Sequence, residues 1–309
     1  MSEIAVDCKQ LTRRYGPRAA VDGLDLQVKG GEIFSILGPN GSGKTTLFRV
    51  LSTLLSPSGG SCEIFGRDVV RQRDAVRRQI GVVFQSPSLD LQLTAEENLR
   101  HHGHLYGLRG DALDNKIDEM LSEVNMNDRR SERVATFSGG MRRRVELAKG
   151  MLTSPKLLIL DEPSTGLDPT ARIDLWAYLF RARIEGGVTI LLTTHLMDEA
   201  DRCDRLAIMD HGKLLACDTP SNLKERIGGD VITLTTNDPQ RVRDYLRLPE
   251  DQIRQFDRTL RFERPRGHEY VPQLIEALPG AIESISVGRP TLEDVFIDLT
   301  GHEFHREIQ

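Results

Sequence analysis

The sequence predicts an α/β protein with a largely parallel core sheet, and three observations support this prediction. A glycine-rich segment follows the apolar run Ile33 to Leu37, and the apolar run Leu157 to Leu160 ends in two carboxylates. Between these runs and after them, strand-like stretches alternate with helical ones, as expected when helices cover a parallel sheet. We predict a large domain over residues 1–227 and a small α/β domain over 228–309, with Gly228-Gly229 at the boundary.

The N-terminal region and the middle of the chain add two subdomains to this core. The runs Ile4 to Gln10, Leu24 to Val28 and Ser61 to Phe65 carry β-forming residues between turn residues, which predicts an antiparallel β subdomain. A helical subdomain is expected at about residues 90–150. Its first helix begins after Thr94, which forms a capping-box pattern with Glu97, and a second helix begins at Asp111.

The glycine-rich segment is a predicted phosphate-binding loop because it fits G-x-x-x-x-G-K-[ST]. Its glycines allow consecutive backbone N–H groups to surround a β-phosphate, and a helix beginning near Lys44 directs its positive end at the same anion. Lys44 is expected to reach the β- and γ-phosphates, and the hydroxyl of Thr45 to ligate Mg²⁺. The predicted nucleotide-binding residues here are Gly38, Pro39, Asn40, Gly41, Ser42, Gly43, Lys44, Thr45 and Thr46.

The second apolar run delivers Asp161 and Glu162 at the end of a strand. Asp161 is expected to hold the metal, directly or through water, and Glu162 to act on an attacking water. Together the two segments predict a nucleoside-triphosphatase. They do not distinguish a kinase, a small GTPase, a RecA-like motor and a transporter ATPase.

The stretch before the acidic strand makes that distinction. Phe137-Ser138-Gly139-Gly140-Met141-Arg142 opens a basic helical run and resembles the L-S-G-G-Q signature of the ATP-binding-cassette (ABC) superfamily. The resemblance covers about the first 225 residues and implies a P-loop NTPase (RecA-like) core that hydrolyses ATP with Mg²⁺. Phe137 and Met141 depart from the usual residues. The γ-phosphate contacts are expected from the Ser138 hydroxyl and the N–H groups of Gly139 and Gly140, so both departures are compatible with activity.

The same resemblance assigns roles to further positions. Tyr15 resembles the aromatic residue that stacks on adenine, and Gln85 the glutamine that contacts Mg²⁺ and the membrane partner. Asp168 lies in a loop that crosses between subunits, and His195 resembles the histidine that holds the γ-phosphate. Each residue also has a structural alternative: packing for Tyr15, a polar loop residue for Gln85, and a hydrogen-bonded strand-end residue for His195.

Two polar clusters are interpreted as solvent-exposed helix faces. The run Arg142, Arg143, Arg144 is expected to form local salt bridges; a nucleic-acid patch is the alternative. Glu97, His101 and His104 have helical spacing that could hold a metal, but nothing nearby supplies a fourth ligand.

The C-terminal residues predict a small α/β module. Strands are expected at Val231 to Thr235, Leu260 to Phe262 and Ala281 to Val287, with helices at Pro239 to Leu246 and Tyr270 to Leu278. A last helix is expected to be capped by Thr291 and Asp294 and to end at Gly301. The sequence Arg-Pro-Thr-Leu-Glu-Asp-Val-Phe, from Arg289 to Phe296, spans its start. This sequence resembles the C-terminal extension of drug-exporter ATPases of the daunorubicin-resistance type, and favours an exporter of the type-2 ABC class over an importer. The structural alternative is that the module covers apolar surface or helps dimerisation.

Composition narrows the class of protein, its partners and its cellular location. Hydrophobic residues make up 39% and charged residues 28%, the formal net charge is −5, and the scattered cysteines Cys8, Cys62, Cys203 and Cys217 read as reduced thiols. No nucleic-acid partner is expected. No secretion signal or bilayer-length apolar run is seen, so a transporter would need a separate transmembrane permease. The expected location is the cytoplasm, peripheral on the cytoplasmic face of the membrane.

The family resemblance also implies a second nucleotide-binding subunit, either an identical copy or a paralogue, arranged head to tail. Each Ser138 loop would then close over the ATP of the other subunit. Two alternatives remain: a soluble ABC ATPase that acts on ribosomes or DNA, and a regulatory subunit without turnover. The first is disfavoured by a single phosphate loop and no sustained heptads, and the second by the presence of Glu162 and His195.

Overall fold

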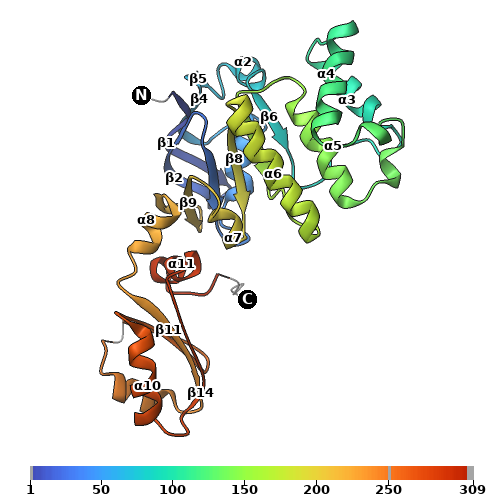
Figure 1. Ribbon diagram of the computed structural model, residues 1–309. Helices are drawn as coiled ribbons and strands as arrows, with labels where there is room; N and C mark the ends of the chain where they lie inside the picture. The colour runs from blue at the N-terminus through green and yellow to red at the C-terminus, as the bar shows by residue number, and fades with distance from the viewer. Residues whose placement is uncertain (1–2, 250–251, 305–309) are drawn as a thin grey trace. The chain divides into compact units, whose positions relative to one another are not determined.

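The structure is a computed structural model that describes residues 3–249 and 252–304 (Figure 1). The chain divides into two compact units, Met1–Cys217 and Asp218–Gln309. This division lies closer to the N-terminus than the boundary predicted between residues 227 and 228. The reason is that the short helix α8 (Pro220–Glu225) packs against α11 (Leu292–Thr300) of the second unit.

The first unit is built on a six-stranded sheet with the order β10-β9-β3-β8-β7-β6. Strands β3, β6, β7, β8 and β9 pair in parallel, as predicted. Every residue of β3, β7 and β8 is buried, which explains why these strands read as continuous apolar runs and not as alternating ones. The strands are β3 (Ile33–Leu37), β6 (Ile80–Val83), β7 (Leu157–Asp161), β8 (Thr189–Thr194), β9 (Arg205–Asp210) and β10 (Lys213–Asp218).

The predicted antiparallel subdomain is a four-stranded sheet with the order β2-β1-β4-β5. Its two long strands form a hairpin that ends at the directly paired residues Tyr15 and Arg18. The sheet also brings together two cysteines that appear scattered in the sequence: Cys8 and Cys62 are cross-strand partners whose free thiol sulfurs lie 3.1 Å apart. The strands are β1 (Ile4–Tyr15), β2 (Arg18–Lys29), β4 (Gly59–Ile64) and β5 (Arg67–Asp68).

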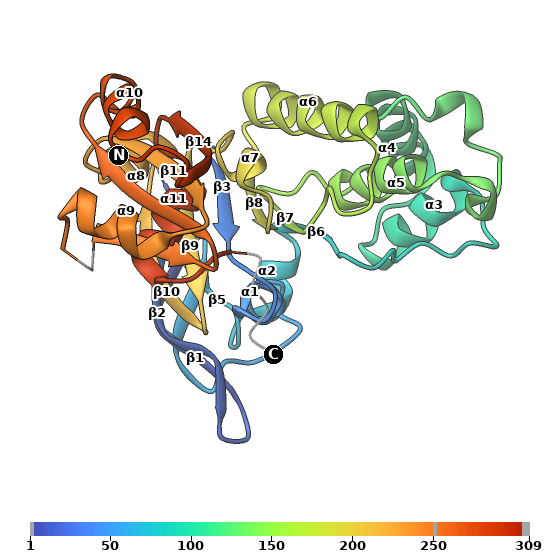
Figure 2. The same cartoon turned by 90° about the horizontal axis from the view of Figure 1, so that it is seen from below.

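Helices α3, α4 and α5 form a separate group beside the parallel sheet, as Figures 1 and 2 show. The capping box predicted at Thr94 and Glu97 is present, with both reciprocal hydrogen bonds formed. The Glu97 carboxylate therefore caps α3. None of the helices within the described residues is both long enough and apolar enough to cross a bilayer. The helices of this unit are α1 (Lys44–Leu51), α2 (Arg73–Arg77), α3 (Ala95–Leu105), α4 (Gly110–Glu123), α5 (Gly139–Met151), α6 (Pro169–Gly186) and α7 (Met197–Ala200).

The second unit contains the order β-α-β-β-α-β followed by α11, with an antiparallel sheet ordered β12-β13-β11-β14. This is the ferredoxin-like arrangement. The sequence prediction lacked its second strand, β12, because four residues with little apolar alternation give a weak strand signal. The elements are β11 (Asp230–Thr236), α9 (Pro239–Leu246), β12 (Ile253–Phe256), β13 (Thr259–Arg264), α10 (Gly267–Ala277) and β14 (Ile282–Gly288).

Candidate functional site

The site lies at one edge of the parallel sheet because four neighbouring strands end there. The phosphate loop follows β3, His195 follows β8, Glu162 follows β7, and Gln85 follows β6. These strands are adjacent in the order β3-β8-β7-β6, so residues far apart in the sequence meet at their carboxyl ends. Open parallel sheets bind ligands at this edge.

The phosphate loop owes its shape to glycines that admit no side chain. Gly43 has a φ of 105°, and a Cβ atom there would lie 2.2 Å from the carbonyl oxygen of Ala20. A Cβ atom at Gly38 would lie 2.4 Å from the carbonyl oxygen of Met209. The loop is therefore held against the neighbouring backbone, and it leads directly into the first turn of α1.

Lys44 is buried at the start of α1 and reaches back over the loop. Its ammonium donates hydrogen bonds to the carbonyl oxygens of Gly38, at 2.7 Å, and Pro39, at 3.0 Å. It also lies 3.5 Å from Oε1 of Glu162. Burial lowers the pKa of the Lys44 ammonium, while the Glu162 carboxylate acts in the opposite direction and favours the charged form.

Glu162 contacts three other residues of the site. Its Oε2 atom accepts hydrogen bonds from Gln85 Nε2, at 3.2 Å, and from the Thr165 hydroxyl, at 3.3 Å. The same oxygen lies 3.1 Å from Nδ1 of His195. The Glu162 backbone has a left-handed φ of 45°, which is strained for a residue with a side chain.

Thr193 holds that strained backbone and the neighbouring aspartate. The backbone N–H of Glu162 donates to the carbonyl oxygen of Thr193, at 3.2 Å, and to its hydroxyl, at 3.0 Å. The hydroxyl in turn donates to Oδ1 of Asp161, at 2.6 Å. Burial raises the pKa of the Asp161 carboxyl, and the Thr193 hydrogen bond counteracts part of this rise.

A cleft of about 380 Å³ opens in front of these groups. A volume of this order suits a small-molecule ligand. Tyr15 forms one wall with its ring half-exposed, and the guanidinium carbon of Arg13 lies 5.0 Å from the centre of that ring. The lining residues are Tyr15, Arg18, Ala20, Asn40, Gly41, Gly43, Lys44, Thr45, Thr46, Gln85 and Glu162.

The signature residues are not part of this lining. Ser138 caps α5, and its hydroxyl accepts a hydrogen bond from the backbone N–H of Met141, at 3.3 Å. Ser138 and Gly139 are exposed, so the positive end of α5 faces solvent. Asp168 is likewise a helix-capping residue: its carboxylate caps α6 by accepting a hydrogen bond from the N–H of Ala171, at 2.9 Å.

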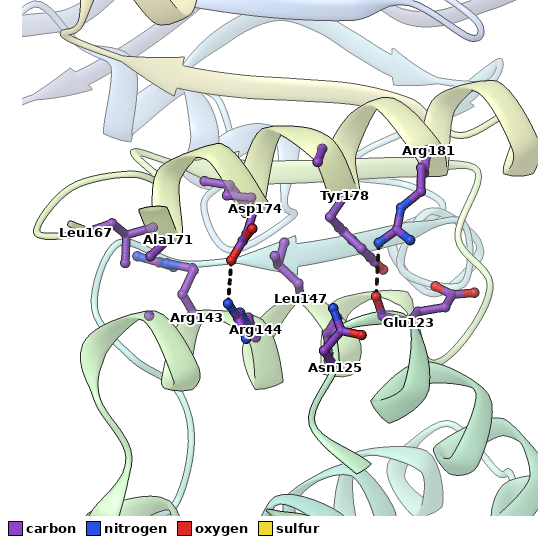
Figure 3. A pocket seen from close by; sticks show the side chains of 14 residues that line it. Glu123, Asn125, Arg143, Arg144, Leu147, Leu167, Ala171, Asp174, Tyr178 and Arg181 are labelled. Atoms are coloured by element: carbon purple, nitrogen blue, oxygen red, sulfur yellow. Dashed lines mark hydrogen bonds and ion pairs between the residues drawn. The ribbon is translucent and has the colours of Figure 1, made fainter. Parts of the chain in front are cut away.

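The basic run on α5 was predicted to be solvated, and this is wrong for Arg143. Only 7% of Arg143 is exposed, and its guanidinium pairs with Glu146 at 3.0 Å. Arg142 donates to backbone carbonyl oxygens. Arg144 forms a salt bridge with Asp174 of α6, so this bridge joins two helices and is not the local one expected; both residues line a cavity of about 320 Å³ between α5 and α6 (Figure 3). Three consecutive helical positions point in different directions, so one of them faces the protein interior.

Sequence reasoning missed three residues that shape the site. Arg18 lines the cleft and donates to the carbonyl oxygen of Gly41, at 3.4 Å; its place opposite Tyr15 in a hairpin was a usable signal. Thr193 carried a weaker signal, as a polar residue at the end of an apolar run. Arg143 gave none, because the charge run around it is typical of an exposed helix face.

The fold and the site define an ABC-type ATPase. A family model described as ABC transporter matches residues 21–165, and a model described as the C-terminal domain of DrrA1-3-like ATP-binding proteins matches residues 219–300. The chain belongs to the family of ABC transporter ATP-binding proteins, which bind ATP. Its second unit is the DrrA-type C-terminal domain.

Two curated relatives match along almost their whole length. The daunorubicin/doxorubicin resistance ATP-binding protein DrrA of Streptomyces peucetius is 39% identical over 96% of this chain and 93% of its own. The Nod factor export ATP-binding protein I of Rhizobium johnstonii is 37% identical over 99% of this chain and 98% of its own.

Solved structures agree with this assignment. CbiO1 from Clostridium perfringens, described as part of the ABC transporter complex cbiONQ, has a TM-score of 0.67 and 27% identity, covering 80% of this chain and 96% of its own. A dimeric, post-hydrolysis structure of the ATP-binding cassette MJ0796 with ADP and Pi has a TM-score of 0.63 and 27% identity, covering 69% and 98%.

Proposed function

We propose that this chain is the ATP-hydrolysing subunit of an ABC export system and that it drives a separate transmembrane permease. The observation that carries the proposal is the meeting of Lys44, Glu162, Gln85 and His195 beside one cleft. The names of its relatives, which refer to daunorubicin resistance and Nod factor export, support export of a drug-like or lipid-like compound.

The substrate is ATP, bound with its adenine on Tyr15 and its phosphates in the loop from Gly38 to Thr46. The half-exposed ring of Tyr15 offers a stacking face at the mouth of the cleft. Lys44 exchanges its bonds to the Gly38 and Pro39 carbonyl oxygens for bonds to phosphate oxygens, which are charged and therefore stronger acceptors.

The residues around Glu162 fit a magnesium ion. The Thr45 hydroxyl, the Gln85 amide oxygen and the Asp161 carboxylate form a set of hard oxygen donors, which Mg²⁺ prefers. Burial disfavours the charged form of Asp161, and a nearby divalent cation would stabilise that charge. These three residues would hold the ion, which would supply neutralisation of charge on the β- and γ-phosphates.

Hydrolysis depends on Glu162 as the general base. Its carboxylate accepts a proton from the attacking water, while Gln85 and Thr165 orient it through their hydrogen bonds. His195, 3.1 Å from the same carboxylate oxygen, holds the γ-phosphate and responds to its release. The protein contributes position and electrostatics, which carry most of the catalysis in phosphoryl transfer.

Two subunits share each ATP in a head-to-tail dimer. Ser138, Gly139 and Gly140 do not line the cleft of their own chain, yet they present an exposed helix N-terminus suited to an anion. Asp168 lies in the loop that crosses to the partner. Moving such a pair from mostly open to mostly closed takes about 5.5 kcal/mol of differential binding. Several charge-assisted bonds of roughly 1.5–3 kcal/mol each, made only in the closed dimer, supply it.

The permease receives this motion through Gln85 and the residues that follow it, at the cytoplasmic face of the membrane. Glu162→Gln tests the proposal: the variant should bind ATP, lose turnover and accumulate as a dimer. Co-purification of the chain from membranes, followed by sequencing of its partner, should identify a polypeptide with several membrane spans. A ribosomal or DNA-bound partner would contradict the export role.

A further inference from the structure

The signature helix α5 makes several hydrogen bonds to the loop that carries Gln85. This loop, residues 84–88, is the first part of the connection from β6 to α3 and has no regular secondary structure of its own. Three residues of α5, spaced i, i+3 and i+6, face it: Arg143, Glu146 and Lys149. Residues at such spacing lie along one side of a helix, so the three form a continuous contact strip.

Each residue of the strip bonds to the backbone of the loop. Arg143 donates to the carbonyl oxygen of Phe84, at 2.8 Å, and to that of Gln85, at 3.4 Å. Glu146 accepts from the backbone N–H of Ser88, at 2.6 Å. Lys149 donates to the carbonyl oxygen of Ser88, at 2.9 Å. One helix therefore holds this part of the connection at Phe84, Gln85 and Ser88.

Two of these three residues, Arg143 and Glu146, are buried and paired with each other. Arg143 is 7% exposed and Glu146 is 2% exposed, and they form an ion pair at 3.0 Å. A buried charge without a partner is costly, so each of these residues requires the other. The planar guanidinium fork of Arg143 contacts two successive carbonyl oxygens and a carboxylate, and its donors have fixed relative directions.

We propose that Arg143 is a positioning residue for ATP hydrolysis, because it fixes the backbone of Gln85 so that the Gln85 side chain meets Glu162. The connection runs from the guanidinium to the Gln85 carbonyl oxygen, and from Gln85 Nε2 to Glu162 Oε2, at 3.2 Å. This inference rests on the proposed function of Gln85 and Glu162. It adds a rigid link between the helix that begins with Ser138 and the base of the same subunit.

The test is a double-mutant cycle in the full-length chain, with Arg143→Lys and Gln85→Ala measured singly and together. Lysine keeps a positive charge beside Glu146 but lacks the planar fork, so its single nitrogen cannot hold the two carbonyl oxygens and the carboxylate in the same geometry. We expect Arg143→Lys to lower kcat about tenfold, as for loss of one hydrogen bond to a charged group, with Kd for ATP within about twofold of wild type. In the Gln85→Ala background the same change should alter kcat less than about twofold.

A structural role would give a different result. If Arg143 only supports the fold, its replacement lowers kcat by the same factor with or without Gln85, and the proposal is overturned; an unchanged kcat in Arg143→Lys overturns it too. Arg129→Lys, an exposed Arg-to-Lys change in the segment between α4 and α5, is the matched control and should behave as wild type. Arg143→Met with Glu146→Leu, which removes the buried pair together, repeats the cycle if the lysine variant does not fold.

The proposed function fails separately from this inference. Absence of ATP hydrolysis in the wild-type chain, or full activity in Gln85→Ala, would remove the role of Gln85 and with it any role of Arg143 in positioning it. A loss of activity in Gln85→Ala with additive loss in the double variant would leave the ATPase role intact and remove the role of Arg143 alone.

Discussion

The ammonium of Lys44 lies 3.5 Å from Oε1 of Glu162, although the two residues belong to motifs far apart in the sequence. Both side chains are less than one tenth exposed. The phosphate-binding cation and the base therefore share one buried environment, and a change in the charge of either side chain acts on the other. The following predictions depend on this site and on the elements that position it.

Glu162→Gln should abolish turnover and preserve ATP binding. The amide keeps the size and a hydrogen-bond acceptor for Gln85 but cannot take a proton from water, so kcat should fall roughly 10²–10⁴-fold. Phosphate release measures turnover, and light scattering with ATP measures the trapped dimer. Phosphate release at the wild-type rate would exclude Glu162 as the base.

Lys44→Ala should weaken nucleotide binding at least about tenfold, because the phosphates lose a charge-assisted partner whose side chain is buried beside the loop. Equilibrium binding of a fluorescent ATP analogue measures the change. Lys116→Ala is the control, since Lys116 pairs with Glu119 on the surface of α4. Equal affinity in wild type and Lys44→Ala would contradict the phosphate-loop assignment.

Tyr15→Ala should cost about 1–3 kcal/mol of ATP binding, whereas Tyr15→Phe should cost little. Stacking requires an aromatic face and not the hydroxyl. Isothermal titration of ATP and of triphosphate without a base separates the two contributions, because only ATP carries the adenine. The assignment does not survive if both variants, or neither, lose affinity for ATP.

Gly43→Ala should destabilise the fold and distort the phosphate loop. The added Cβ atom would lie 2.2 Å from the Ala20 carbonyl oxygen, a contact that requires backbone movement. Gly107→Ala is a matched control, since Gly107 also has a positive φ, of 84°, but open space around it. Denaturant unfolding should show a loss of about 1 kcal/mol for the control and clearly more for Gly43→Ala.

The free energy of unfolding should decrease in mild acid because His102 is partly buried in its neutral form. Burial, with a smaller contribution from Lys149, lowers the pKa of His102 to about 4 from its usual 6.5. Between these values the unfolded chain binds the proton and the folded chain does not, so stability is lost as the pH falls from 6.5 towards 4. The loss should be about 2 kcal/mol, after allowance for the partial exposure of the ring.

His102→Gln should remove this part of the pH dependence. Urea unfolding at pH 7 and pH 4.5 measures it, and His104→Gln, an exposed position on the same helix, is the control. If wild type and His102→Gln lose the same stability between these pH values, His102 does not carry the effect.

Much of the fold and most of the candidate site could be predicted from the sequence, because the relevant signals are local. The glycines before Lys44, the apolar run before Asp161 and the capping box at Thr94 each depend on a few consecutive residues. Consecutive residues fix backbone conformation, and backbone conformation fixes where a strand ends and a helix begins. The order of such signals then identified a nucleotide-binding cassette without any knowledge of its contacts.

Tertiary structure decided which side chains face one another. Arg143 lies in a charge run that reads as exposed, yet it is buried because α5 packs against the loop of Gln85. Cys8 and Cys62 are neighbours because of the register of β1 and β4. The packing of α8 places the boundary between the two units earlier in the chain than predicted. These relationships depend on the packing of elements that are distant in sequence, and the charge run did not indicate which of its three arginines faces the interior.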